Sequence, residues 1–225
     1  MIQINGLSKR FDENTDLHFN DLKFEDGMSY AILGPSGCGK STLLNMISGI
    51  IKPDSGDIIV TNSNNKEPIN VTNLSQKQRD DFRFNNIGYI FQDYKLIEDF
   101  SVIDNIELLN LNGKKYNKKE IESILERVKL LHKKKQKVKT LSGGEKQRVA
   151  IARALIKKSD IVLADEPTES LNETLSHEIV ELLIKLSKED KKTVIMVTHD
   201  TSLTKYFDKT IVISDILAKE GADNV

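Results

Sequence analysis

Residues 28–50 read MSYAILGPSGCGKSTLLNMISGI, so a short apolar run, a glycine-rich turn and a helical pattern follow one another directly. The turn, GPSGCGKS, matches the pattern G-x-x-x-x-G-K-[ST] at every fixed position. Between a strand and a helix, such a turn directs backbone N–H groups at phosphate oxygens. We therefore expect Lys40 to reach the β- and γ-phosphates of a nucleotide and Ser41 to hold Mg²⁺. The residues of this loop expected to bind the nucleotide are Gly34, Pro35, Ser36, Gly37, Cys38, Gly39, Lys40, Ser41 and Thr42.

Short apolar runs alternate with helical patterns along the rest of the chain. The runs typical of strands buried on both faces are residues 28–33, 57–60, 87–91, 161–164, 193–197 and 210–213. Apolar residues recur at helical spacing over 121–131 and 179–186. This alternation predicts an α/β fold with a parallel sheet.

Three other segments complete the predicted organisation. Residues 1–24 alternate weakly and are expected to form antiparallel strands at a sheet edge. Residues 61–72 are rich in Asn, Lys and Ser and are expected to form a surface loop, and residues 218–225 a frayed end. Residues 93–158 contain no clear strand and are expected to be a helical insertion.

Composition excludes several classes of protein. The chain has 225 residues, 33 basic and 34 acidic side chains, and a net charge of −1, so broad attraction to nucleic acid is not expected. Its apolar runs are far shorter than the roughly 20 residues of a membrane span, and its start does not resemble a secretory signal. Its single cysteine, Cys38, excludes a disulfide framework.

Two acids end the apolar run at 161–164. Ligands bind at the carboxyl ends of parallel strands, so Asp165 is expected to coordinate Mg²⁺ and Glu166 to act as a base on water. An ordinary solvated strand end is the alternative for these acids taken alone.

A second motif, LSGGEKQR at residues 141–148, shortly precedes this acidic strand. On these motifs the chain resembles the nucleotide-binding subunit of an ABC transporter. The resemblance implies a P-loop NTPase of RecA-like core with an N-terminal antiparallel β subdomain and an inserted helical subdomain. It also implies one ABC ATPase domain over residues 1–225, with a core lobe at about 1–92 and 159–225 and a helical subdomain at about 93–158.

The resemblance also assigns site residues. Gln92 would sense Mg²⁺ and the attacking water, His199 would orient Glu166, and Phe11 would stack on adenine. The implied catalytic residues are Glu166, His199, Gln92 and Lys40, and the implied Mg²⁺ ligands are Ser41, Gln92 and Asp165. The signature residues Ser142, Gly143 and Gly144 would cap ATP held by a second ATPase subunit, so that ATP joins two subunits head to tail.

Residues 82–97 and 101–106 are similar to the corresponding stretches of macrolide exporters, lipoprotein-release ATPases and the cell-division ATPase. This implies a permease partner, docked in a groove near residues 92–97 lined by Tyr94, Leu96 and Ile97, and attachment to the cytoplasmic face of the membrane. The alternative for these side chains is that they fill the core of the insertion.

Other interpretations stay open. The ATPase could drive transport, or it could transmit force in envelope signalling or cell division, and the sequence does not encode a substrate. Asn172 stands where the family has Asp, which affects communication between two ATP sites. Alkylation of Cys38 is expected to block ATP binding, unless this residue merely fits the loop.

Overall fold

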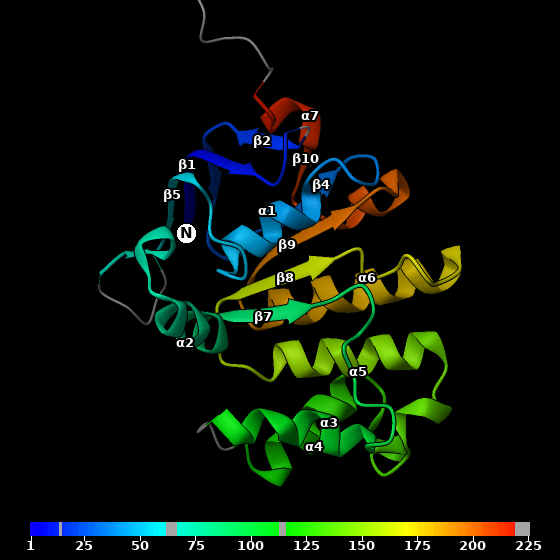
Figure 1. Ribbon diagram of the computed structural model, residues 1–225. Helices are drawn as coiled ribbons and strands as arrows, with labels where there is room; N and C mark the ends of the chain where they lie inside the picture. Colours follow the sequence, from blue (N-terminus) through cyan, green and yellow to red (C-terminus); the bar gives the residue numbers. More distant parts are fainter. Residues whose placement is uncertain (14, 62–66, 113–115, 219–225) are drawn as a thin grey trace, which may run out of the picture.

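The computed structural model describes residues 1–13, 15–61, 67–112 and 116–218. Within these residues, the centre is a five-stranded parallel sheet, with a five-stranded antiparallel sheet on one side and helices on the other (Figure 1). In spatial order the parallel strands are β10 (Lys209–Val212), β4 (Ser29–Leu33), β9 (Thr193–Thr198), β8 (Ile161–Asp165) and β7 (Ile87–Ile90). The predicted α/β class with a parallel core is confirmed.

The antiparallel sheet contains the N-terminal strands, as expected. It also contains residues 57–60, and the expectation that they form a strand buried on both faces is wrong, because Ile58 and Val60 are buried whereas Asp57 and Ile59 are only partly buried. The members of this sheet are β1 (Ile2–Arg10), β2 (Asp16–Phe19), β3 (Leu22–Phe24), β5 (Ser55–Val60) and β6 (Ile69–Asn70). The expected loop at 61–72 is wrong in its second half, because β6 pairs with β5 and is followed by the 3₁₀ turn η1 (Val71–Asn73). Residues 62–66 of that loop, and 219–225 of the expected frayed end, lie outside the described residues.

Helix α1 (Lys40–Ile47) lies between the two sheets. Its buried side chains, Leu43, Leu44, Met46 and Ile47 among them, join one hydrophobic cluster with residues of β1, β4 and β5. This burial fixes the first turn of α1 at the carboxyl end of β4, which is where the phosphate loop must lie.

The opposite face of the parallel sheet is covered by α5 (Gly143–Leu155) and α6 (Glu173–Glu189). Strand β8 shows why the sheet needs both layers, since Val162 and Ala164 enter the cluster with α5 and α6, whereas Leu163 enters the cluster with α1. Both faces are buried, which accounts for the continuous apolar runs.

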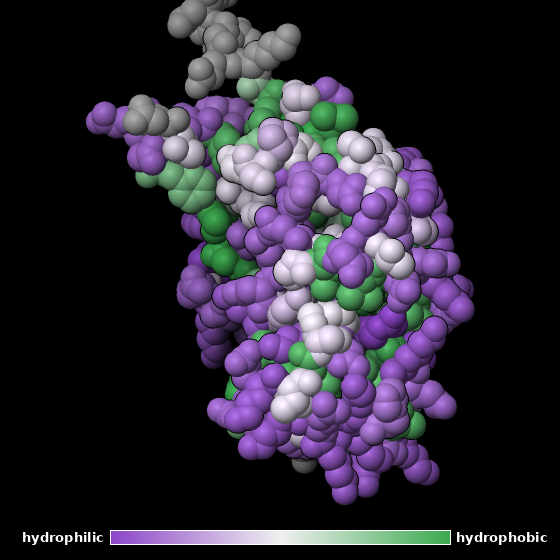
Figure 2. Space-filling view, turned by 90° about the vertical axis from the view of Figure 1, so that its right-hand side faces the viewer, coloured by the Kyte–Doolittle hydropathy of each residue, from purple (hydrophilic) through white to green (hydrophobic). Residues whose placement is uncertain are grey.

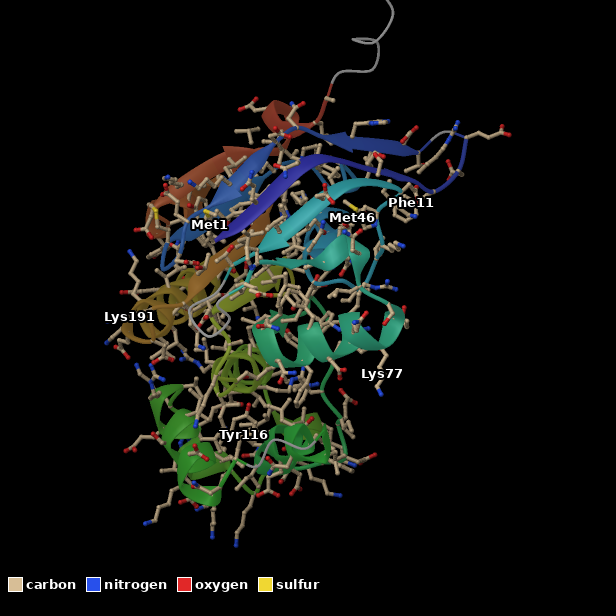
Figure 3. The ribbon with its side chains drawn as sticks, turned by 90° about the vertical axis from the view of Figure 1, so that its left-hand side faces the viewer. Met1, Phe11, Met46, Lys77, Tyr116 and Lys191 are labelled. Atoms are coloured by element: carbon tan, nitrogen blue, oxygen red, sulfur yellow. The ribbon has the colours of Figure 1, made fainter. Side chains whose placement is uncertain are left out.

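A helical part packs on α5 at the end of the molecule farthest from the antiparallel sheet (Figure 1). It contains α3 (Val102–Glu107), η2 (Leu108–Asn112), α4 (Lys118–Arg127), η3 (Leu131–Lys133) and η4 (Val138–Thr140). Figure 3 shows Tyr116 within this part and Phe11 at the far end of β1. The remaining elements are α2 (Gln76–Asn86), η5 (Thr201–Tyr206) and α7 (Ile213–Ile216).

Two local contacts hold the parallel sheet to its helices. A Cβ on Gly88 would lie 2.6 Å from the carbonyl oxygen of Ala154, so β7 and α5 approach at backbone distance. At the other edge, partial burial opposes ionisation of Asp208, but bonds from Lys188 and Ser29 outweigh it and lower the pKa of Asp208 to about 2. Among the described residues, no helix combines the length and apolar character that would cross a membrane.

Candidate functional site

The carboxyl ends of the parallel strands form one face of the molecule. Figure 2 shows this face as mostly hydrophilic, with hydrophobic side chains gathered near its middle. The loop after β4, the acids after β8 and the histidine after β9 follow adjacent strands, so the topology brings them together.

The phosphate loop folds around the ammonium group of Lys40. The Lys40 Nζ donates hydrogen bonds of 2.7 Å to the carbonyl oxygens of Gly34 and Pro35. It also lies 3.1 Å from Glu166 Oε1, and the Lys40 side chain is only 4% exposed. Gly39 precedes it at a φ of 96°, in the left-handed region where a side chain would be strained. The loop therefore presents a buried cation at the start of a helix.

Asp165 faces the second residue of α1. The Ser41 hydroxyl donates to Asp165 Oδ1 at 2.6 Å. Burial raises the pKa of Asp165, and the bond from Ser41 opposes this rise. A hydroxyl beside a carboxylate is an oxygen donor set of the kind Mg²⁺ prefers, and the ion usually takes its other ligands from phosphates and water. The residues present therefore fit Mg²⁺.

Glu166 has a left-handed backbone with a φ of 42° and is 8% exposed. Its N–H donates to Val197, so the start of the turn after β8 is tied to β9. Its Oε2 lies 2.7 Å from Nδ1 of His199, and its Oε1 contacts Lys40. One carboxylate thus connects the cation of the loop with the histidine, whose side chain is 47% exposed.

A cavity of about 310 Å³ opens beside this group. Its lining consists of Phe11, Thr15, Leu17, Ser36, Gly37, Gly39, Lys40, Ser41, Thr42, Gln92, Glu166 and Glu169. Phe11 is 50% exposed, and Lys9 Nζ lies 5.9 Å from its ring centroid. An aromatic rim, the Lys40 ammonium and the hydroxyl and backbone N–H groups at the start of α1 suit a base attached to phosphates.

Several residues differ from their expected places. Gly34, Pro35, Cys38, Asp165 and His199 do not line this cavity. Thr15, Leu17 and Glu169 do line it, although the sequence patterns had not identified them. Gln92 Nε2 donates to Glu169 Oε2 and not to the Ser41 and Asp165 pair. No motif covers Glu169, but its place three residues after Glu166 is a signal that could have drawn attention to it.

The signature residues begin α5. Ser142 is the N-cap, its Oγ accepting from the N–H of Glu145 and its N–H donating back to Glu145 Oε2. Lys133 lies 2.5 Å from Glu145, and this bond lowers the Glu145 pKa. Helix α5 therefore starts at Gly143, because the cap compensates for the poor helix propensity of glycine.

Residues 142–144 do not line the phosphate cavity of the same chain. A Cβ on Gly144 would lie 2.6 Å from Leu175 Cδ2, so glycine allows α5 to start close to α6. At the start of α6, Asn172 Oδ1 accepts from the N–H of Leu175 at 3.0 Å. Asn172 therefore keeps a capping role that needs no charge.

A cavity with a different lining lies near the groove expected at residues 92–97. Tyr94 and Leu96 pack against the hydrophobic cluster that the helical part shares with α5, α6 and the parallel sheet, while Ile97 is 43% exposed. The nearby cavity has a volume of about 420 Å³. It is lined by Asp80, Arg83, Phe84, Ile87, Tyr89, Phe91, Lys95, Asn105, Leu108, Leu109, Arg153, Ala154 and Lys157. The groove lined by Tyr94, Leu96 and Ile97 stays a prediction, because Tyr94 and Leu96 are only partly buried against the apolar cluster.

Comparisons with known proteins agree with this geometry. The family described as ABC transporter matches residues 17–169. The chain is 37% identical over 215 residues to the lipoprotein-releasing system ATP-binding protein LolD of Treponema denticola, covering 92% of each chain. It is 38% identical over 219 residues to the ABC transporter ATP-binding protein YtrE of Bacillus subtilis, covering 96% of this chain and 92% of that one.

Solved structures extend the likeness to the fold. The dimeric ATP-binding cassette MJ0796 of Methanocaldococcus jannaschii, in a post-hydrolysis state bound to ADP and Pi, has a TM-score of 0.81 at 32% identity over 94% of each chain. The cbiO1 protein of Clostridium perfringens, part of the ABC transporter complex cbiONQ, also has a TM-score of 0.81 at 32% identity, covering 94% of this chain and 83% of that one.

Proposed function

The chain belongs to the ABC transporter family of ATPases, and from this premise we propose that it powers a permease of the lipoprotein-release or peptide and antibiotic export type. The observation that carries the catalytic part of the proposal is the chain of contacts from Lys40 through Glu166 to His199 at the edge of the cavity. The permease type is supported by the relatives named for lipoprotein release.

In this proposal, the adenine stacks on Phe11 and the phosphates enter the glycine-rich loop. Lys40 neutralises phosphate charge, and the backbone N–H groups at the start of α1 donate to phosphate oxygens. Ser41 and Asp165 would hold Mg²⁺, and Gln92 would join them only after turning from Glu169, to which it donates in this structure. The bound ion would offset the charge of the transferred phosphoryl group.

Glu166 acts as the base in hydrolysis. Its Oε2 takes a proton from the attacking water while His199 holds the carboxylate through the 2.7 Å contact. Lys40 stabilises the negative charge that grows on the phosphoryl oxygens. The left-handed backbone of Glu166 and its bond to β9 keep the carboxylate pointed at the cavity edge.

The signature residues act on a second copy of the chain. Residues 142–144 do not line the cavity of their own chain, which supports a head-to-tail dimer. In this dimer, Ser142, Gly143 and Gly144 cap phosphate held by the other subunit. The dimeric state of the cassette from M. jannaschii also supports this arrangement. The first turn of α5 would offer the positive end of its dipole to that phosphate.

The chain divides into a core lobe at 1–92 and 159–225 and a helical subdomain at 93–158. The packing of α3 and α4 on each other supports a separate helical part, and α5, which packs both on them and on the sheet, joins it to the core lobe. The cavity beside α2 receives a helix of the permease, because its floor is aromatic and aliphatic and basic side chains surround it. Attachment to the cytoplasmic face of the membrane then comes from this docking.

The docking proposal is tested with two variants of α2. Phe84→Asp places a charge in the cavity lining, whereas Lys77→Asp places one on the exposed side of the same helix (Figure 3). Tagged chains are purified from detergent-solubilised cells. We expect wild type and Lys77→Asp to retain an integral membrane protein and Phe84→Asp to lose it while still binding ATP. Equal retention by both variants contradicts the docking site.

A further inference from the structure

Tyr94 lies in a tight turn that the phosphate site does not explain. Tyr94 and Lys95 have φ values of 59° and 48°, which residues other than glycine rarely adopt. The guanidinium of Arg153, on α5, donates to the Tyr94 carbonyl oxygen at 2.6 Å and to the Lys95 carbonyl oxygen at 2.5 Å. These two hydrogen bonds from Arg153 hold the strained turn against α5.

The side chain of Tyr94 reaches the turn that follows β8. Its hydroxyl lies 2.7 Å from Ser170 Oγ, within hydrogen-bonding distance. Two residues earlier, Gln92 donates to Glu169. Two neighbouring side-chain bonds therefore join residues 92–94 to residues 169–170, which form the exposed middle of the turn between Glu166 and Asn172.

The same hydroxyl lies against the start of α5. A Cβ on Gly143 would lie 3.3 Å from Tyr94 Oη and 3.3 Å from Leu171 Cδ2. The tyrosine thus contacts the first helical residue of the signature and the turn that carries Glu166. Displacing Tyr94 would move both relative to the phosphate cavity.

We propose that Tyr94 is a positioning residue for ATP hydrolysis, acting through Ser170 on the turn that begins at Glu166. Arg153 fixes the backbone of Tyr94, and the Tyr94 hydroxyl fixes Ser170. The ends of the turn are held by Val197 at Glu166 and by the cap at Asn172, and the bonds of Gln92 to Glu169 and of Tyr94 to Ser170 anchor its exposed middle to residues 92–94. The inference rests on the proposed role of Glu166 but needs no permease.

The test is a double-mutant cycle on the full chain with MgATP. The variants are Tyr94→Phe, Ser170→Ala and their combination, with Tyr206→Phe as the matched control. Tyr206 makes no hydroxyl hydrogen bond within the part of the chain that the structure describes. Steady-state kcat, ATP affinity and thermal midpoint are measured for each. Glu166→Gln tests the role of Glu166 separately.

We expect kcat to fall roughly two- to tenfold in each single variant, since one uncharged hydrogen bond is lost. The double variant should be no slower than the slower single variant, because both substitutions remove the same bond. The ATP affinity and the thermal midpoint of the Tyr94 and Ser170 variants should match wild type, because water replaces the lost partner at the exposed Ser170. The control variant Tyr206→Phe should match wild type in kcat as well. Unchanged kcat in the single variants, additive losses, or an equal loss in Tyr206→Phe would overturn the proposal.

Discussion

Replacing His199 with alanine removes the contact that holds Glu166. Nδ1 of His199 lies 2.7 Å from Oε2 of a carboxylate that is 8% exposed. A hydrogen bond to a charged group contributes about 1.5–3 kcal/mol, which corresponds to roughly 10- to 150-fold in rate. Because the His199 side chain is 47% exposed, solvent weakens the bond, and we expect a loss near the lower limit, about tenfold in kcat.

The assay is phosphate release by the purified chain under saturating MgATP, with nucleotide affinity measured separately. His132→Ala is the matched control, since His132 is exposed on η3. ATP affinity should change little, because His199 does not line the cavity. The reasoning is refuted if His199→Ala turns over as fast as the control, or if its loss lies wholly in ATP binding.

Three further changes test the fold around the site. Gly88→Ala should lower the free energy of unfolding by about 1–3 kcal/mol and the thermal midpoint by about 2–12 °C, because the new Cβ would meet the Ala154 carbonyl. A calorimetric midpoint equal to that of wild type contradicts this prediction. Asp208→Asn should lower the free energy of unfolding at pH 7, measured by urea denaturation, by up to about 2 kcal/mol. Since folding lowers this pKa from 3.8 to about 2, the difference from wild type should vanish as pH falls through that range, and a difference independent of pH contradicts it. Asn172→Ala should lower the free energy of unfolding by about 0.5–2 kcal/mol, whereas Asn172→Asp should leave it unchanged because aspartate also caps a helix. Equal stability of Asn172→Ala and wild type contradicts the capping role.

Much of the fold follows from sequence because local pattern and tertiary arrangement agree. The glycine-rich turn at 34–41, with a strand before it and a helix after it, and the apolar runs fixed both the parallel sheet and the place of its ligand-binding edge. Element ends were less predictable. Helix α5 includes Gly143 and Gly144 because Ser142 caps it, and β6 forms in a polar segment because β5 offers an edge.

The parts of the site that escaped prediction depend on contacts between distant residues. Glu169 meets Gln92 across 77 residues of sequence, and Ser170 meets Tyr94 across 76. These contacts form because β7 and β8 are parallel neighbours, so the loops that follow them lie together. No periodicity or motif in the sequence indicates either pair. Phe11 was identifiable only through the family resemblance, since a single aromatic residue is most often part of a core.

The most direct test of the catalytic account is the Glu166→Gln variant of the full chain, measured for phosphate release and for size in solution with and without MgATP. A general base contributes typically 10²–10⁴-fold, so turnover should fall by about a hundredfold or more. The variant should still bind ATP and should sediment as a dimer only when ATP is present. Near wild-type turnover, or a monomer with ATP bound, would contradict the account.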